Sequence, residues 1–262
     1  MTEKLNRKKI IKEIKNNGFY ILDNYLSNQD IDKIKKSLLK VLHYIKPDNE
    51  NNLQKKYYQI KKYSPILKGN WFDIVTSDIS ILQFLYAPII INLVKEFFDT
   101  DVVFCGRRHL NVFDNENDKL LAPHQERNQM SKDTLILWAP IYDTNKDNGG
   151  ITIFKNSHKH GYFNHSYEQS RSGDKRWTGG YNHVDSAITK RFEKVELEIK
   201  AGSALLMQSK VIHCGYPIKK KENVRMVLTE RYNPLQKIPF LKDENATMNI
   251  PITGVDHNKI SD

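Results

Sequence analysis

The first hundred residues carry apolar side chains at the spacing of α-helices. Ser27 and Asp30 form a typical helix start, and Ile31 and Ile34 begin a series of apolar residues three or four positions apart. A polar segment, residues 47–73, interrupts this pattern and is expected to be a long loop. The helices predicted in this way cover residues 4–17, 27–46, 77–86 and 88–98.

After residue 100 the apolar period shortens to that of β-strands. Asn148-Gly149-Gly150 and Ala201-Gly202 separate strands as turns, and residues 156–190 form a long polar insertion between two of them. Helices followed by strands, without β-α alternation, predict antiparallel sheets with helices packed outside them. The predicted strands cover residues 18–22, 101–113, 134–141, 151–155, 192–199, 203–208 and 224–233.

The length of 262 residues is enough for one domain with a full core. We expect a single domain over residues 1–262, with a mainly helical part in 1–100. The strand core is expected in 101–233, and an irregular segment in 234–262.

Composition narrows the class of protein. The longest apolar run, around residues 88–94, is too short to span a bilayer, and Cys105 and Cys214 cannot make a disulfide framework. A cytoplasmic protein without a membrane partner is therefore expected. The net charge of +10 comes from lysines scattered along the chain, so no nucleic-acid partner is expected. A basic surface favours an anionic small-molecule substrate.

The candidate chemistry centres on the segment Pro123-His124-Gln125-Glu126. Its imidazole and carboxylate stand two residues apart and therefore share one face of an extended segment. A second imidazole, His213, would complete three ligands on one side of a metal, as in the facial triad of non-haem Fe(II) oxygenases. Arg225 follows in a predicted strand, where an inward guanidinium is costly unless it meets an anion such as a dicarboxylate. Strand alternation predicts one face carrying Arg225, Val227, Thr229 and Arg231.

With these residues in order, the chain resembles the phytanoyl-CoA dioxygenase (PhyH-like) family of Fe(II)/2-oxoglutarate-dependent oxygenases. The resemblance implies a double-stranded β-helix, a cupin-like jelly roll, with the N-terminal helices packed on one sheet. The matching pieces are residues 18–22 with the Ser27 helix, Pro123 to Glu126, Asn148-Gly149-Gly150, residues 156–161, Gly202-Ser203, His213 and Arg225.

The resemblance also implies roles for individual residues. His124, Glu126 and His213 would be the catalytic ligands of Fe(II). Arg225 would pair with the distal carboxylate of the cosubstrate 2-oxoglutarate, and Asn111 would help to hold that cosubstrate. The implied reaction converts 2-oxoglutarate and O2 to succinate and CO2 while a substrate is hydroxylated.

Two positions depart from the family pattern. The usual carboxylate ligand is Asp, whereas this chain has Glu126, which keeps the charge and adds one methylene. A halogenating relative would have Ala or Gly there, so Glu126 favours hydroxylation. Relatives often place Ser or Thr two residues after the distal histidine, whereas this chain has Gly215, so that contact is expected to be missing.

Two other classes of function remain open from the residues alone. One is a non-redox, cupin-like protein that binds a small molecule or sugar, although such a protein has no reason to keep Arg225 opposite the metal. The other is a zinc hydrolase built on His158, His160 and His165.

The polar insertion contributes candidate substrate contacts. Arg171, Arg176 and Trp177 combine cations with an aromatic ring, which suits an anionic substrate.

Overall fold

The computed structural model describes residues 6–115, 122–126, 131, 133–168 and 181–238. The helices are α1 (Arg7–Asn17), α2 (Asn28–Ile45), α3 (Leu53–Tyr63), α4 (Pro65–Val75), α5 (Ile79–Leu85), α6 (Pro88–Phe98) and α7 (Ser186–Thr189), with 3₁₀ turns η1 (Ser157–His160) and η2 (Leu235–Lys237). The strands are β1 (Phe19–Leu22), β2 (Val103–Asp114), β3 (Leu135–Pro140), β4 (Ile151–Phe154), β5 (His165–Glu168), β6 (Tyr181–Val184), β7 (Lys194–Leu197), β8 (Ala204–Gln208), β9 (His213–Gly215) and β10 (Val224–Pro234).

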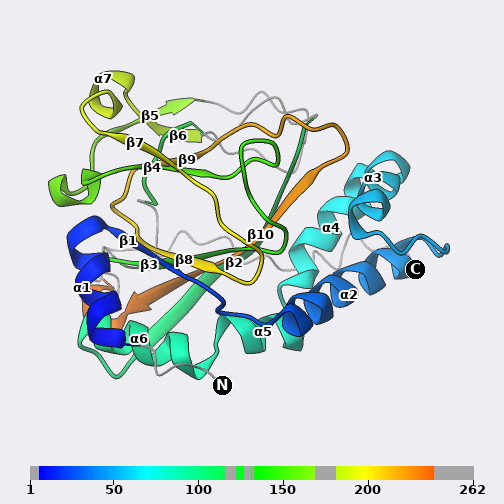
Figure 1. Cartoon of the computed structure of the whole chain (residues 1–262), viewed down its shortest axis with the longest axis horizontal. Helices are drawn as coiled ribbons and strands as arrows, with labels where there is room; N and C mark the ends of the chain where they lie inside the picture. The colour runs from blue at the N-terminus through cyan, green and yellow to red at the C-terminus, as the bar shows by residue number, and fades with distance from the viewer. Residues whose placement is uncertain (1–5, 116–121, 127–130, 132, 169–180, 239–262) are drawn as a thin grey trace, which may run out of the picture.

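The strands form two main antiparallel sheets. The larger sheet has the order β1-β8-β3-β10-β2, and the smaller has the order β7-β4-β9. The smaller sheet covers one face of the larger, and the N-terminal helices cover the other (Figure 1). The predicted jelly-roll architecture with helices on one sheet is confirmed.

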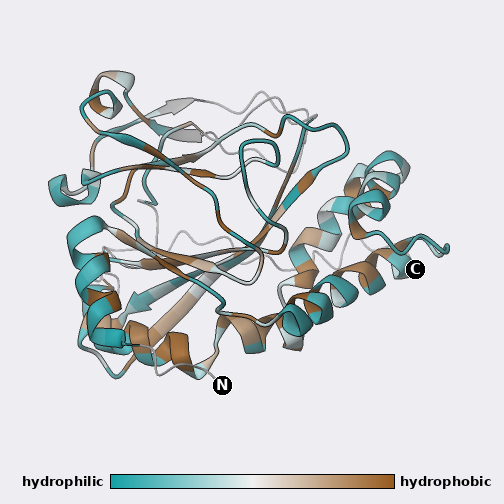
Figure 2. Cartoon of the chain, in the orientation of Figure 1, coloured by the Kyte–Doolittle hydropathy of each residue, from teal (hydrophilic) through white to brown (hydrophobic). Residues whose placement is uncertain are grey.

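Alternation along the central strands supplies two cores at once. On β3, Leu135 and Leu137 pack among the helices, whereas Ile136 and Trp138 face the smaller sheet. The hydropathy colouring shows the resulting apolar strands between polar outer surfaces (Figure 2). Because both faces of β3 are buried, its sequence is apolar throughout rather than alternating.

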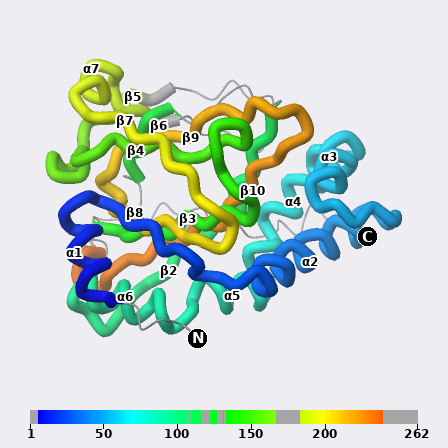
Figure 3. Tube along the Cα trace, in the orientation of Figure 1, coloured from blue at the N-terminus to red at the C-terminus, as the bar shows by residue number. Residues whose placement is uncertain are grey.

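The N-terminal segment joins the larger sheet as an edge strand. Gly18 ends α1 in a left-handed conformation with a φ of 88°, and β1 then pairs with β8 from Phe19↔Met207 to Leu22↔Ala204. The traces of β1 and β8 accordingly run side by side in Figure 3. This confirms the short strand predicted over residues 18–22.

The helix predicted from Ser27 also has the expected start. The Ser27 hydroxyl accepts a hydrogen bond from the Asp30 amide at 3.2 Å, and the Asp30 carboxylate accepts one from the Ser27 amide at 3.3 Å. This is a reciprocal capping box. The buried residues of α2, Ile31, Ile34 and Leu38 among them, follow the predicted helical spacing.

The prediction of a long loop over residues 47–73 is wrong. This segment contains α3 and α4, and Leu53, Tyr57 and Ile60 of α3 are buried at helical spacing. Four lysines and two glutamines on the same short helix hide that apolar stripe in the sequence. Ser64 then caps α4, whose first residue is a proline.

The insertion over residues 156–190 contains more regular structure than its polar sequence indicated. Within its described part, β5 and β6 pair as an antiparallel ribbon from His165↔Val184 to Glu168↔Tyr181. The turn η1 precedes this ribbon and the short helix α7 follows it.

The stretch Ile79–Phe98 is long and apolar enough to cross a membrane by length and composition alone. In the structure it is divided into α5 and α6, and Pro88 starts the second helix. Its residues Ile81, Leu85 and Ile90 lie in the core against the larger sheet.

Candidate metal and cosubstrate site

Backbone pairing brings the two candidate ligand histidines together across 89 positions of sequence. The His124 amide donates to the His213 carbonyl at 3.0 Å, and the His213 amide donates back to the His124 carbonyl at 2.9 Å. Their ring centroids are therefore only 4.4 Å apart. The sheet itself builds this pair.

Hydrogen bonds to carbonyl groups orient both imidazoles. His124 Nδ1 lies 2.8 Å from the Ala122 carbonyl oxygen, and His213 Nδ1 lies 3.0 Å from that of Val211. Because a carbonyl oxygen only accepts, both Nδ1 atoms carry the proton and both Nε2 atoms present a lone pair. Burial, reinforced by the adjacent His124, lowers the pKa of His213 to about 4, so this ring is neutral at physiological pH.

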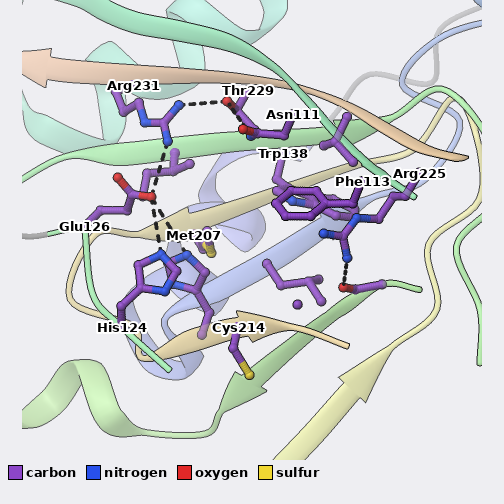
Figure 4. Close-up of a pocket in the computed structure, with 16 residues that line it drawn as sticks. Asn111, Phe113, His124, Glu126, Trp138, Met207, Cys214, Arg225, Thr229 and Arg231 are labelled. Carbon is purple, nitrogen blue, oxygen red and sulfur yellow. Dashed lines mark hydrogen bonds and ion pairs between the residues drawn. The ribbon is translucent and has the colours of Figure 1, made fainter. Parts of the chain in front are cut away.

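The Glu126 carboxylate faces both lone pairs. Its Oε1 atom lies 3.9 Å from His124 Nε2 and 4.0 Å from His213 Nε2, as the dashed lines in Figure 4 show. Burial would raise the pKa of Glu126, but the nearby Arg231 and His124 hold it well below its ordinary value. The group thus offers two imidazole nitrogens and one anionic carboxylate oxygen.

This donor set fits a divalent transition metal. One ligand atom from each of His124, Glu126 and His213 lies within 4.8 Å of the others. Among the described residues, these three are the group of His, Cys, Asp or Glu side chains that lie close enough together to hold a metal ion. Donors about 2.1 Å from an ion stand roughly 3 to 4 Å apart. Two imidazoles and one carboxylate on one side of an ion leave the opposite positions open to cosubstrate and O2.

The residue between the ligands fixes the segment from its other side. The side-chain nitrogen of Gln125, Nε2, donates to the backbone carbonyls of Gly161 at 2.8 Å and Lys210 at 2.6 Å. Its amide oxygen accepts from the Phe163 backbone at 2.8 Å. Alternation turns Gln125 away from the metal side, so its three bonds hold the backbone that carries both neighbouring ligands.

The β5–β6 ribbon attaches directly to the same segment. The Val184 backbone amide donates to the Pro123 carbonyl at 2.7 Å, and the Gln125 backbone amide donates to His165 Nε2 at 3.1 Å. The ribbon is therefore joined to the segment that carries His124 and Glu126.

Arg225 lies in the same cavity as the three candidate ligands. The residue is only 7% exposed, and its guanidinium donates to the Gly150 carbonyl at 2.6 Å and lies 4.5 Å from the centre of the Phe113 ring. Burial lowers its pKa to about 10, which still leaves a cation at neutral pH. No carboxylate of the described residues lies within ion-pair distance of it, so the cavity contains a buried cation suited to an incoming anion.

Asn111 also lines this cavity and donates to the Thr229 hydroxyl at 3.3 Å. The predicted face of β10 is confirmed, because Arg225, Val227, Thr229 and Arg231 all line the cavity. Sequence reasoning placed Arg231 on this face but gave it no function, and it overlooked the apolar wall. The apolar side chains lining the cavity are Phe113, Ile136, Trp138, Ile151, Met207 and Val227.

The three histidines of the alternative zinc site serve other contacts. His158 is buried with Nε2 at 3.3 Å from the Lys15 carbonyl, and the His160 ring lies edge-on to Phe192 at 5.3 Å. His165 receives the Gln125 amide. The described residues therefore give no support to a zinc hydrolase. Arg171, Arg176 and Trp177 lie outside the described residues.

Solved structures share this fold over most of the chain. SnoN, an epimerase solved with Fe3+, alpha-ketoglutarate and nogalamycin RO, superposes with a TM-score of 0.62 at 13% identity, covering 97% of this chain and 93% of that one. SnoK, a non-heme alpha-ketoglutarate-dependent carbocyclase from nogalamycin biosynthesis, gives 0.56 at 13% identity, covering 87% and 83%. EvdO2 from Micromonospora carbonacea var. aurantiaca, complexed with 2-oxoglutarate, gives 0.56 at 13% identity, covering 86% and 89%.

At these low identities the likenesses show the fold alone, and no curated protein matches the sequence. The family model provides the stronger finding, because it matches residues 14–226, well over half of the chain. This range contains His124, Glu126, His213 and Arg225. The chain belongs to the phytanoyl-CoA dioxygenase (PhyH) family of non-haem iron, 2-oxoglutarate-dependent enzymes.

Proposed function

We propose that this protein hydroxylates a small anionic molecule in a reaction that consumes 2-oxoglutarate and O2 and releases succinate and CO2. One observation carries the proposal. The Nε2 atoms of His124 and His213 face the Glu126 carboxylate at 3.9 and 4.0 Å, in a cavity that also holds the buried cation Arg225. A metal site beside an anion site is what a chelating dicarboxylate requires.

The proposed roles of the ligands follow from their chemistry. Fe(II) held by His124, Glu126 and His213 would supply the oxidising chemistry together with 2-oxoglutarate and O2. The protein's part is to hold both imidazoles turned with Nε2 toward the metal, which the carbonyl partners of their Nδ1 atoms achieve. The retained carboxylate occupies the position that a halogenating relative would free for chloride, and this supports hydroxylation.

Arg225 is proposed to bind the distal carboxylate of 2-oxoglutarate. The Gly150 carbonyl and the Phe113 ring hold its guanidinium in place, so little ordering is needed when the anion arrives. Asn111 would donate from the neighbouring strand β2. Gly215 brings no hydroxyl to this site, so the cosubstrate depends more heavily on the arginine.

An anionic substrate is supported by charge. The chain has a net charge of +10, which raises the local concentration of anions. Arg171, Arg176 and Trp177 of the insertion are proposed as substrate contacts, since the ribbon that flanks them attaches beside His124.

A metal titration tests the site. The metal-free protein is titrated anaerobically with Fe(II), and 2-oxoglutarate is then added while the visible charge-transfer absorption of the chelate is followed. The wild type should bind one Fe(II) and develop the band, and His124→Ala should do neither. The exposed His160 provides a matched control, because His160→Ala removes an imidazole without touching the site. Equal iron affinity in His124→Ala and the wild type would refute the assignment.

Isotopic labelling tests the reaction. The loaded enzyme is given 2-oxoglutarate, isotopically heavy O2 and a panel of anionic and neutral small molecules, and succinate and substrate masses are measured. Hydroxylation leaves one heavy oxygen atom in the product, whereas an epimerisation or ring closure changes the substrate without adding one. Succinate formed with an unlabelled, rearranged product would refute hydroxylation and leave the cofactor assignment intact.

A further inference from the structure

The guanidinium of Arg231 lies against the carboxylate that we assign to the metal. Its Nη2 atom is 3.2 Å from Glu126 Oε1, the same oxygen that faces both imidazoles (Figure 4). Arg231 is only 8% exposed and lines the cavity. The family pattern that identifies the metal ligands does not assign this arginine a role.

A short relay along the strands fixes Arg231 in that position. Its Nη1 atom donates to the Thr229 hydroxyl at 2.7 Å, and Thr229 in turn receives the Asn111 amide at 3.3 Å. Alternation along β10 places Thr229 and Arg231 on the cavity face together. One arm of the guanidinium is therefore anchored to the sheet, and the other points to Glu126.

Glutamate needs such an anchor more than aspartate does. Its side chain has one more rotatable bond, so the backbone alone determines the position of the carboxylate less closely. A carboxylate oxygen has two lone pairs, so Oε1 can keep its bond to Arg231 while its other side faces the imidazoles. The longer ligand and the arginine thus form one geometric unit.

We propose that Arg231 is a positioning residue for the metal ligand Glu126, which it holds turned toward His124 and His213 before the metal binds. This proposal rests on the proposed function, because it takes Glu126 as a ligand of Fe(II). It predicts that the effect of Arg231 on metal affinity requires the longer side chain of Glu126. The shorter aspartate at position 126 would withdraw the carboxylate oxygen from Arg231.

The test measures metal affinity in the full-length protein, independently of turnover. Calorimetric titrations with Co(II) compare the wild type with Arg231→Gln, Arg231→Lys and Thr229→Val, and the Co(II) absorption spectrum reports the ligand geometry. Loss of a residue that orients a metal ligand typically weakens affinity about 10- to 100-fold. Arg231→Gln should show such a loss and an altered spectrum, with partial recovery in Arg231→Lys and a smaller loss in Thr229→Val.

Arg108→Gln is the matched control. Arg108 lies on the adjacent strand β2, and its contacts are to Tyr86 and Ser77, away from the ligands. It should bind Co(II) as the wild type does. An affinity of Arg231→Gln within about twofold of that of the wild type would overturn the positioning role. A tighter affinity would overturn it as well, because it would mean that the Arg231 cation merely repels the metal.

A double-mutant cycle with Glu126→Asp decides whether the two residues act together. If Arg231 works through Glu126, the Arg231→Gln loss should nearly vanish in the Glu126→Asp background. Fully additive losses would overturn the proposal. His124→Ala separates the two hypotheses: if it binds Co(II) like the wild type, both fail, whereas a loss there with an unaffected Arg231→Gln refutes positioning alone.

Discussion

Replacement of Arg225 by methionine should affect cosubstrate binding and protein stability in opposite directions. Methionine keeps an unbranched, flexible side chain, although a shorter one, and removes the charge. In the structure the buried guanidinium has the Gly150 carbonyl and the Phe113 ring as partners, without a carboxylate among the described residues. The cation therefore carries a desolvation cost that an incoming dicarboxylate would offset.

The expected magnitudes follow from this environment. Removal of one partner of a buried, hydrogen-bonded charge pair costs about 2–5 kcal/mol, so the Kd for 2-oxoglutarate should rise roughly 30-fold to several thousand-fold. Without cosubstrate, desolvation costs several kcal/mol per ion, whereas one carbonyl bond and one cation–π contact together return only about 2–4 kcal/mol. The unfolding free energy of cosubstrate-free Arg225→Met should therefore equal or exceed that of the wild type.

The assay combines calorimetry and denaturation. Co(II)-loaded protein is titrated with 2-oxoglutarate under argon, and the cosubstrate-free protein is unfolded in urea. Arg108→Met is the control for loss of a guanidinium from the same sheet, and it should change neither quantity substantially. The reasoning is refuted if Arg225→Met binds 2-oxoglutarate within about threefold of the wild type, or if it loses more than about 2 kcal/mol of stability without cosubstrate.

Three further outcomes test the scaffold around the site. Burial raises the pKa of Glu230, so the stability that its protonated form contributes is lost as the pH rises from the ordinary glutamate pKa through the folded pKa. In urea unfolding, Glu230→Gln should therefore gain in stability relative to the wild type as the pH rises above the ordinary glutamate range, and a pH-independent difference would contradict this. Gly18→Ala should lose at least about 1–2 kcal/mol in the same assay, because Gly18 has a φ of 88° and the new methyl would lie 2.6 Å from His158; wild-type stability would contradict this. Gln125→Ala leaves three part-buried backbone groups without their side-chain partner, which costs at most about 1–3 kcal/mol each. Both its urea midpoint and its Co(II) affinity should therefore fall, and an unchanged affinity would show that Gln125 does not hold the candidate ligands.

The elements that the sequence predicts well are those whose burial produces a simple period. The stripe that begins with Ile31 and Ile34, with its capping box, specifies α2 almost to the residue. By contrast, the sequence of α3 predicts a loop, because lysines and glutamines fill six of the eight positions around Leu53, Tyr57 and Ile60. Three apolar positions suffice there because the Tyr57 hydroxyl also reaches the buried Asp114 carboxylate at 2.7 Å, a contact that no local pattern encodes.

The group of candidate metal ligands could be predicted for a similar reason, since extended segments fix which residues share a face. The contact of Arg231 with Glu126 could not be predicted, because it depends on how β10 pairs with β2. On β2 the pairing shifts from His109 opposite Thr229 to Gly106 opposite Arg231, so the extra residue lies on β2 and the alternation of β10 continues unbroken. The bulge leaves Arg231 on the cavity face, and only the folded sheet brings the guanidinium to the carboxylate.

The cavity draws its two chemical characters from different strands. Strand β10 contributes the cations Arg225 and Arg231, while β3 and β8 contribute apolar walls that include Trp138 and Met207. An apolar wall opposite fixed cations excludes water and strengthens every charge interaction between them. We expect these strands to serve mainly the binding of the cosubstrate and metal. The β5–β6 ribbon attaches to the ligand segment from outside the two main sheets, through hydrogen bonds to the backbone of Pro123 and Gln125. We therefore expect binding of the metal and cosubstrate to depend on the two main sheets, and selectivity for the substrate to depend on the insertion over residues 156–190.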